Sequence, residues 1–148
     1  MTKTFQRRPV VGGSDTAHSV VTHQGFNTLA SINTAGSSIN RKGLCKDQSN
    51  PELYGKQIPD QALCLPETIG STTGGVLFSV VSNGYASACM LFSKRVDPLV
   101  LSGAVLLKNW SKHSMVLIDE LGDDFLDFVK DRMQIQTSEN GTVVVSDK

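Results

Sequence analysis

Large apolar side chains are spread unevenly along this chain, and their distribution limits what the chain can build on its own. Between positions 1 and 71 they are scattered among Ser, Thr, Asn, Gln and Gly, whereas between 75 and 133 they form dense runs. Because burial of apolar surface drives folding, we expect the core in the second half. A core of roughly 75 residues buries only about 60% of its unfolded surface, so the pattern favours completion against another copy, a partner or a particle surface.

The same distribution divides the 148 residues into two expected regions. Residues 1–71 are predicted to form an extended or loop-rich N-terminal arm, and residues 72–148 a compact α+β core. The stretch from 27 to 40 is rich in Ser, Thr, Asn and Gly, which favour turns and extended chain over helix. Pro51, Pro59 and Pro66 then block any long helix before the core begins.

Within the second region the sequence predicts a mainly antiparallel sheet. Asn83-Gly84 is a turn signal that favours a hairpin between flanking apolar runs, and a second Asn-Gly pair at 140–141 predicts a C-terminal hairpin. An amphipathic helix is predicted near 123–133, where apolar side chains recur every three to four residues. The predicted fold is therefore α+β, with about four strands plus the hairpin, one helix and a long irregular arm. The four strands are predicted at 76–81, 85–92, 99–108 and 113–118.

Charge is balanced over the whole chain but separated along it. The net charge is zero, yet residues 1–56 hold seven basic side chains against three acids, and residues 119–131 hold six acids against one lysine. Oppositely charged segments can pair within or between subunits, or stay as two solvated faces. The aromatic and acidic side chains expected at an interface are Phe5, Phe26, Trp110, Asp123, Asp124 and Asp127.

Nucleic-acid contact through the arm is a weaker prediction, because no known nucleic-acid-binding signature accompanies the basic residues. Arginine and lysine side chains can neutralise phosphate groups. The four residues that this prediction names are Arg7, Arg8, Arg41 and Lys42.

No pattern in the sequence predicts a catalytic residue, a metal ligand or a cofactor. The acids near 119–127 lack a calcium-loop spacing and favour ordinary helix-dipole partners over a metal site. Cys89 and His113 could form a nucleophile–base pair, but a cysteine in an apolar run usually packs. The glycine-rich stretch 70–75 precedes a predicted strand and not a helix, so it is interpreted as a flexible joint and not as a phosphate loop.

No motif identifies a family, and only the overall composition of the chain suggests a function. Its Ser/Thr/Asn-rich arm, β-rich apolar runs and near-neutral charge are similar to those of small viral or phage structural proteins. The lead hypothesis is a self-assembling structural or interaction protein, such as a coat or particle component, that forms a homo-oligomer. A small binding or inhibitory module that docks on a protein partner is the alternative, and an enzyme without a recognisable motif is the third and less favoured one. The absence of a signal peptide and of a membrane-spanning run predicts an intracellular or virion location without membrane contact.

Overall fold

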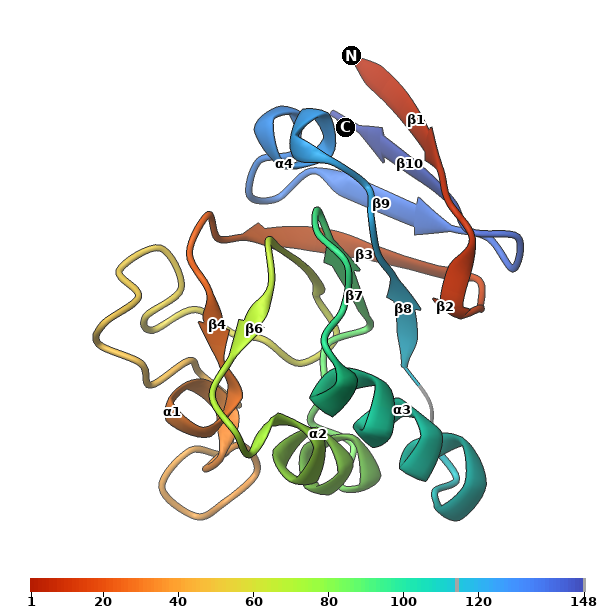
Figure 1. Ribbon diagram of the computed structural model, residues 1–148. Helices are drawn as coiled ribbons and strands as arrows, with labels where there is room; N and C mark the ends of the chain where they lie inside the picture. The colour runs from red at the N-terminus through yellow and green to blue at the C-terminus, as the bar shows by residue number, and fades with distance from the viewer. Residues whose placement is uncertain (114, 148) are drawn as a thin grey trace.

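Eight strands form one mixed sheet in the computed structural model, which describes residues 1–113 and 115–147, and two short strands form a second sheet (Figure 1). The strand order of the large sheet is β1-β10-β9-β3-β5-β7-β8-β2, and β4 pairs with β6. The strands are β1 (Thr2–Gln6), β2 (Pro9–Val11), β3 (Asp15–Val21), β4 (Phe26–Asn27), β5 (Ala62–Leu65), β6 (Thr68–Ile69), β7 (Cys89–Phe92), β8 (Val116–Ile118), β9 (Gln134–Thr137) and β10 (Thr142–Ser146). The helices are α1 (Thr28–Ile32), α2 (Thr73–Ser82), α3 (Pro98–Trp110) and α4 (Asp123–Phe128).

The large sheet curls into a half-barrel, because its two edge strands are neighbours in sequence. Only Arg7 and Arg8 separate β1 from β2, although these strands stand at opposite ends of the strand order. The backbone N–H of Arg7 donates to the carbonyl of Gly141 at 3.2 Å, which holds this short connection against the β9–β10 turn. The two edges of the sheet must therefore approach one another.

The middle of the sheet is parallel and buried on both faces. β3, β5, β7 and β8 pair in parallel, and helices α1, α2 and α3 lie in the connections between them. Successive side chains of a strand point to opposite faces, so Leu63 belongs to one core and its neighbour Cys64 to the other. Such strands are apolar throughout, as expected for parallel strands covered on both sides.

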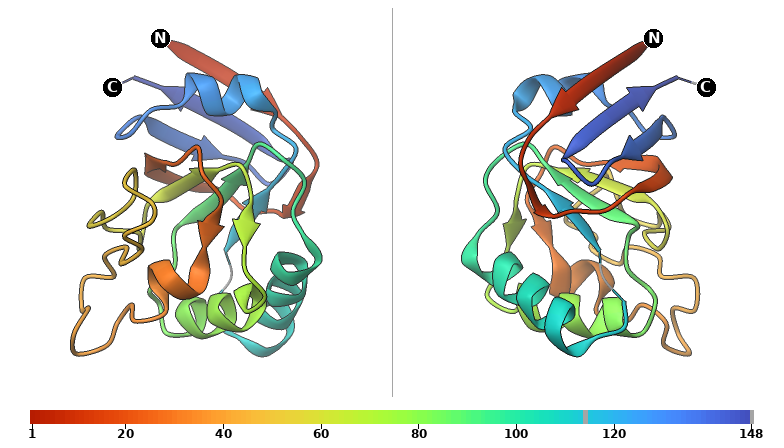
Figure 2. Two further views of the ribbon diagram at one scale, coloured as in Figure 1. Left: turned by 60° about the vertical axis from the view of Figure 1, so that its left-hand side comes forward. Right: turned by 90° about the vertical axis from the view of Figure 1, so that its right-hand side faces the viewer.

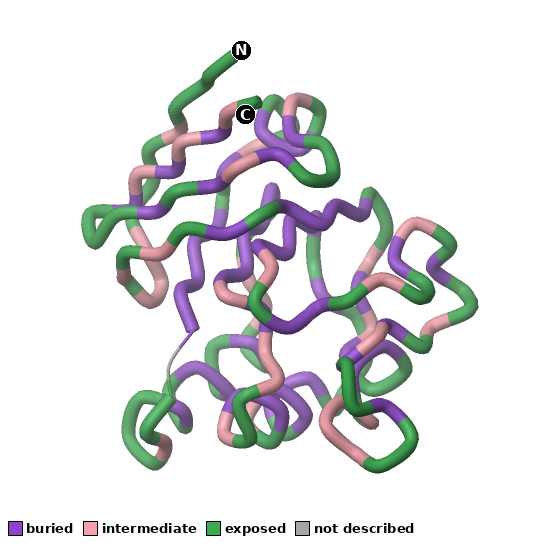
Figure 3. The backbone as a smooth tube through the Cα atoms, turned by 180° about the vertical axis from the view of Figure 1, so that it is seen from behind, coloured by how far each residue is buried: buried purple, intermediate pink, exposed green. Residues whose placement is uncertain are grey.

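Each face of this central sheet has its own cover. Helices α1, α2 and α3, together with the segment 33–61, pack over one face, and α4 with β9, β10 and β1 packs over the other (Figures 1 and 2). The buried backbone runs through the centre of the molecule, and the exposed backbone lies in the outer turns and in the helix surfaces (Figure 3). The sheet therefore positions the starts of α1, α2 and α3 on one side of the molecule.

The predicted fold class is wrong. The apolar runs predicted as strands at 76–81 and 99–108 are the helices α2 and α3, and the central strands are parallel rather than antiparallel. A short apolar run does not reveal by its periodicity whether it is a buried helix or a buried strand. Only 89–92 of the predicted strand 85–92 forms β7, which has parallel neighbours instead of a hairpin partner.

The prediction of a long irregular arm is also wrong, because the first 21 residues supply β1, β2 and β3. Val20, Phe26 and Ile32 are buried within the chain's own core. The polar residues between 33 and 61 form internal hydrogen bonds: the Asn40 side chain donates to the carbonyl of Leu44 at 2.9 Å and accepts from its N–H at 2.8 Å. Polar composition therefore reflects a hydrogen-bonded loop and not an arm.

Three smaller elements lie near their predicted positions. The helix begins at Asp123 as predicted but ends at Phe128, because Val129 is already extended. The C-terminal hairpin is present as the antiparallel pair β9–β10. The predicted strand 113–118 includes position 114, which lies outside the described residues, and residues 116–118 of it form β8.

Candidate functional site

The short connection between β6 and α2 is an exposed polar loop beside the helix starts. Gly70 adopts a φ of +95°, a conformation that suits glycine, and the two residues that follow it, Ser71 and Thr72, are exposed. Because β6 pairs in parallel with β4, with Ile69 opposite Asn27, the loop lies beside the start of α1. Helices α1 and α2 therefore begin next to each other, on the side where the connections leave the sheet (Figure 2).

The three helices that start here differ in how their first N–H groups are satisfied. The Asn27 side chain accepts from the N–H of Ala30 at 3.1 Å in α1, and the Asp97 side chain accepts from the first turn of α3. In α2 the Thr72 side chain makes no capping hydrogen bond, and the first turn holds no acid. The first N–H groups of a helix lack partners within it and carry partial positive charge. The start of α2 is therefore suited to a carboxylate or phosphate group.

A close contact between two glycines fixes this loop against α3. A Cβ atom at Gly74 would lie 2.8 Å from the Ser102 hydroxyl oxygen and 2.9 Å from the Leu99 carbonyl oxygen. On the facing helix, a Cβ at Gly103 would lie 3.1 Å from the Cα of Gly74. Only residues without a side chain allow the two backbones to approach so closely. The start of α2 is thus held directly against the start of α3.

A hydrogen bond between side chains joins the same two connections. The Thr68 hydroxyl donates to the Asp97 carboxylate at 2.8 Å, and Asp97 also accepts from the N–H groups of Leu99 and Val100 at 2.9 Å. One carboxylate therefore caps α3 and ties it to β6, immediately before the loop. The position of Ser71 and Thr72 is fixed from both sides.

A second polar cluster lies at the carboxyl end of β3. His23 Nδ1 lies 2.8 Å from Glu52 Oε2, and Glu52 Oε1 accepts from the His23 N–H at 2.8 Å and from the Thr22 hydroxyl at 3.1 Å. The hydrogen bond to Glu52 raises the pKa of His23, and Asp127 on α4 adds to this effect. Burial opposes ionisation of Glu52, but its hydrogen bonds with His23 and Thr22 outweigh burial and lower its pKa. The cluster ties the 33–61 segment to β3.

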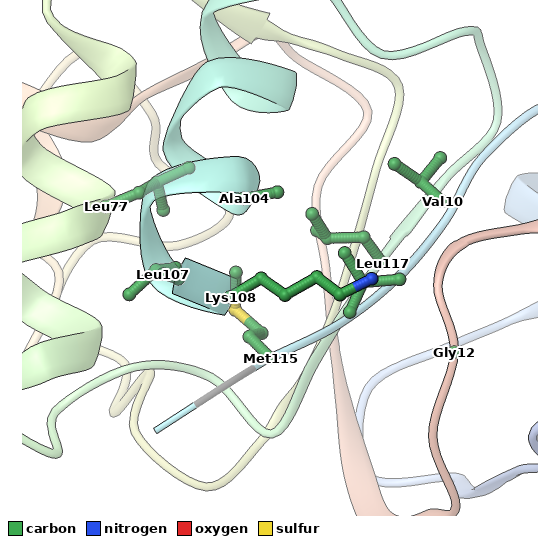
Figure 4. Close-up of a pocket in the computed structure, with 9 residues that line it drawn as sticks. Val10, Gly12, Leu77, Ala104, Leu107, Lys108, Met115 and Leu117 are labelled. Carbon is green, nitrogen blue, oxygen red and sulfur yellow. The ribbon is translucent and has the colours of Figure 1, made fainter. Parts of the chain in front are cut away.

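A crevice of about 290 Å³ lies between the helices and the β2–β8 edge (Figure 4). Lys108 of α3 extends across it beside Leu117, and the remaining side chains that line it are apolar. The crevice lacks the convergent polar groups that a catalytic site requires. Its other lining residues are Val10, Val11, Gly12, Leu77, Ala104, Leu107 and Met115.

The cysteines do not form a reactive or metal-binding group. Cys45, Cys64 and Cys89 are free and buried, and burial raises the pKa of the Cys64 thiol and that of the Cys89 thiol, the latter to about 12. Cys89 therefore remains a neutral thiol, unsuited to act as a nucleophile with His113. Among residues 1–113 and 115–147, no three or more His, Cys, Asp or Glu side chains form a group that could hold a metal ion.

The sequence matches one family model along almost its entire length. The model describes the aconitase X swivel domain, and the match covers residues 4–145. The chain belongs to the aconitase X swivel domain family. No curated protein sequence matches it.

Two known structures share the fold of this aconitase X swivel domain. The crystal structure of holo-form aconitase X from Thermococcus kodakaraensis has a TM-score of 0.78 at 18% identity, and the match covers 97% of this chain and 98% of that one. The solution NMR structure of a UPF0107 protein has a TM-score of 0.74 at 20% identity, with 95% and 97% covered. At these identities the likeness establishes the fold.

Family membership overturns the predicted function. The hypothesis of a self-assembling coat or particle component, with its virion and capsid setting, is wrong, because the chain belongs to an enzyme-related metabolic family. The hypothesis relied on a core deficit in the first half, whereas Val20, Phe26 and Ile32 of that half are buried inside the same chain. In the described part of the chain, no helix is long and apolar enough to cross a membrane.

The aromatic interface candidates occupy three different environments in the swivel domain. Phe5 is half-buried, with its ring centroid 5.3 Å from that of Phe125. Phe26 is fully buried, and Trp110 is 77% exposed at the end of α3. Each of the acidic candidates, Asp123, Asp124 and Asp127, is exposed on α4.

The four basic candidates for nucleic-acid contact do not form one group. Arg7 donates from Nε to the Glu120 carbonyl at 2.7 Å, and its neighbour Arg8 lines a groove beside Arg95. Arg41 and Lys42 are exposed in the 33–61 segment, on the other side of the molecule from the β1–β2 connection (Figures 1 and 2). Of the four basic candidates, only the sequence neighbours Arg7 and Arg8 therefore lie close together.

Sequence reasoning missed the loop at 70–72 because it assigned the following residues to a strand. The stretch 70–75 was expected to be a joint on the ground that a phosphate loop precedes a helix, and it does precede one, α2. One available signal was Asp97-Pro98, since an N-cap residue followed by proline marks a helix start. Recognising α3 would have favoured helical connections between parallel strands, and so a helix after residue 72.

Proposed function

We propose that this chain is the swivel subunit of an aconitase-related hydratase, and that it supplies the loop 70–72 to an active site completed by another chain. Membership of the aconitase X swivel domain family supports the enzyme class. The observation that carries the proposal is the uncapped start of α2, with Ser71 and Thr72 exposed beside it. An intracellular location remains a prediction.

The length of the matched Thermococcus chain supports the proposal that a second subunit completes the enzyme. This chain spans 98% of the matched chain of the Thermococcus aconitase X, so a swivel domain of this size forms a chain of its own there. We infer that the rest of the active site lies on a larger subunit. The described residues of this chain offer no group of three or more metal-binding side chains, so they do not form a metal centre by themselves.

The chemistry of a hydratase assigns a definite role to the loop. In the dehydrating direction, a hydroxy-carboxylate loses a proton from one carbon and hydroxide from the next, and yields an unsaturated acid and water. The N–H groups at the start of α2 would bind the carboxylate, whose charge matches the helix dipole. The hydroxyls of Ser71 and Thr72 would donate hydrogen bonds to the same substrate. Fixing the substrate in this way lowers the entropy cost of the reaction.

The proposal is tested with the tagged full-length chain, isolated from its source cells together with any larger subunit. Dehydration of a panel of hydroxy-carboxylates is followed by the ultraviolet absorbance of the conjugated double bond. Ser71→Ala and Thr72→Ala should each lower kcat/KM about tenfold or more, equivalent to roughly 1.4 kcal/mol per tenfold. Ser79→Ala, at an exposed serine two turns further along α2, is the matched control. Full activity of the Ser71→Ala/Thr72→Ala double variant would rule out this site.

A further inference from the structure

The crevice between the helices and the β2–β8 edge is too large to be an ordinary packing defect. Its volume is about 290 Å³. That is the space of roughly ten water molecules at about 30 Å³ each, whereas protein interiors hold few voids larger than one water molecule. Three of the side chains that line it, Leu107, Met115 and Leu117, are only 3%, 4% and 1% exposed. The crevice is therefore a recess with apolar walls, and a small molecule fits it better than a segment of another protein.

Lys108 gives this apolar recess one positive charge. Its side chain extends over the crevice from α3, with the ammonium group on the side of Leu117 (Figure 4). None of the residues that line the crevice is an acid, and the sequence holds no Asp or Glu between positions 98 and 118. Within residues 1–113 and 115–147, Lys108 makes no ion pair. The charge is therefore available to an anionic ligand.

A lysine on a helix surface often only covers apolar side chains with its stem, while its ammonium group stays in water. Lys112 provides the comparison that separates this role from ligand binding. It follows Lys108 by four residues and is also exposed, but it does not line the crevice. The two lysines therefore differ in whether a ligand in the recess would meet them.

We propose that the crevice binds a small amphipathic monocarboxylate. Its chain of about six to eight carbons would fill the recess, and its carboxylate would pair with the Lys108 ammonium. Burial of the chain supplies most of the binding free energy, because apolar surface of both ligand and protein leaves water. The charge supplies selectivity, because a neutral ligand leaves the ammonium unpaired and a cationic ligand is repelled. With one charged group and no further convergent polar partner, the site binds and does not catalyse.

The crevice lies along the helix pair that holds the loop 70–72. In α2, Leu77 lines the crevice about one helical turn after Gly74. In α3, Leu107 lines it about one turn after Gly103. A ligand in the recess therefore contacts both helices just beyond their close glycine contact. The site is separate from the loop, and binding there does not depend on the proposed function.

The affinity of the purified full-length chain is measured by titration calorimetry with a series of probes. Octanoate should bind with a dissociation constant below about 1 mM. Octanamide and octylammonium share its chain but lack its negative charge, so they should bind about fivefold more weakly or worse. Acetate, which lacks the chain, should not bind detectably. No binding of octanoate, or much tighter binding of the longer dodecanoate, would overturn the assignment of a short-chain acid to this recess.

Two lysine variants test the charge. Lys108→Met keeps most of the side chain and removes its charge, so it should weaken octanoate binding about fivefold and leave octanamide binding unchanged. Lys108→Arg should retain the preference for the carboxylate. Lys112→Met is the matched control and should bind octanoate as the wild-type chain does. Equal affinity of Lys108→Met and the wild-type chain for octanoate would overturn the proposal.

Two filling variants and one spectroscopic signal test the location. Ala104→Leu should abolish octanoate binding, because its added carbons would occupy the recess that Ala104 lines. Val11→Phe fills the recess from the sheet side, and the melting temperature of each variant verifies that it is folded. In NMR spectra of the wild-type chain, octanoate should shift the methyl signal of Met115 but not that of Met133, which lies in the core on the other face of the sheet. Octanoate binding that survives both filling variants, or an unchanged Met115 signal, would overturn the proposal.

Discussion

The contact between α2 and α3 leads to a sharp prediction, because two adjacent glycines of α2 stand in opposite environments. A Cβ at Gly74 would lie 2.9 Å from the backbone carbonyl oxygen of Leu99 and 2.8 Å from the Ser102 hydroxyl oxygen, whereas a Cβ at Gly75 would have no neighbour within 4 Å. Ser102 can rotate away, but the backbone of Leu99 cannot. Gly74→Ala should therefore strain the helix pair, and Gly75→Ala should not.

The magnitude follows from two opposing effects. Alanine is favoured over glycine inside a helix by up to about 1 kcal/mol, and overpacking a close contact costs roughly 1–3 kcal/mol. Gly75→Ala receives only the gain, of about 0.4–1 kcal/mol, while Gly74→Ala receives both. The free energies of unfolding of the two variants should differ by about 2 kcal/mol. For a domain of this size, that difference corresponds to roughly 4–8 °C in melting temperature.

Urea unfolding and thermal melting of the two variants, measured side by side, decide the point. Gly103→Ala is the companion on the facing helix, where a Cβ would lie 3.1 Å from the backbone of Gly74, and it should also destabilise. If Gly74→Ala melts within about a degree of Gly75→Ala, the two helix backbones are not in close contact. The account of how the loop 70–72 is positioned would then be refuted.

Two further predictions concern the polar contacts around the candidate site. Asp97→Ala removes the acceptor of two backbone N–H groups and of the Thr68 hydroxyl, so it should cost about 1–2 kcal/mol in urea unfolding; Asp97→Asn should recover most of this, and equal loss in both variants would argue against the cap. The pKa of His23 is raised and that of Glu52 is lowered, so their mutual stabilisation should be lost as pH rises through the pKa of His23 and as pH falls through that of Glu52. His23→Gln should flatten the pH profile of unfolding free energy by less than about 1 kcal/mol, because both side chains are partly exposed to solvent. An unaltered profile would show that the pair does not affect stability.

The accuracy of the fold prediction depended on the length of each element and on the capping and turn residues at its ends. The helix start at Asp123 and the hairpin around Asn140-Gly141 were predicted from capping and turn residues and are present. The apolar runs of α2 and α3 were predicted as strands, because helices that pack closely through Gly74 and Gly103 carry few polar residues to mark a helical period. The parallel order of β3, β5, β7 and β8 could not be predicted once those connecting helices were missed.

The candidate site escaped prediction for a more specific reason. Sequence analysis finds the start of a helix by residues such as Asp at or beside the N-cap. Asp97 caps α3, and Asp123 is the first residue of α4, whose N-cap Gly122 is followed by two acids. At α2 the residue before the helix, Thr72, makes no capping bond, and no acid follows in the first turn. The lack of a cap removes one helix signal from the sequence and leaves the first N–H groups free for another acceptor, although α3 was missed as well despite its Asp97 cap. Local rules of folding are expected to fail where a chain keeps groups available for function. Among the connections that contain α1, α2 and α3, the start of α2 carries the weakest capping signal, and it is the start next to the loop proposed to bind the substrate.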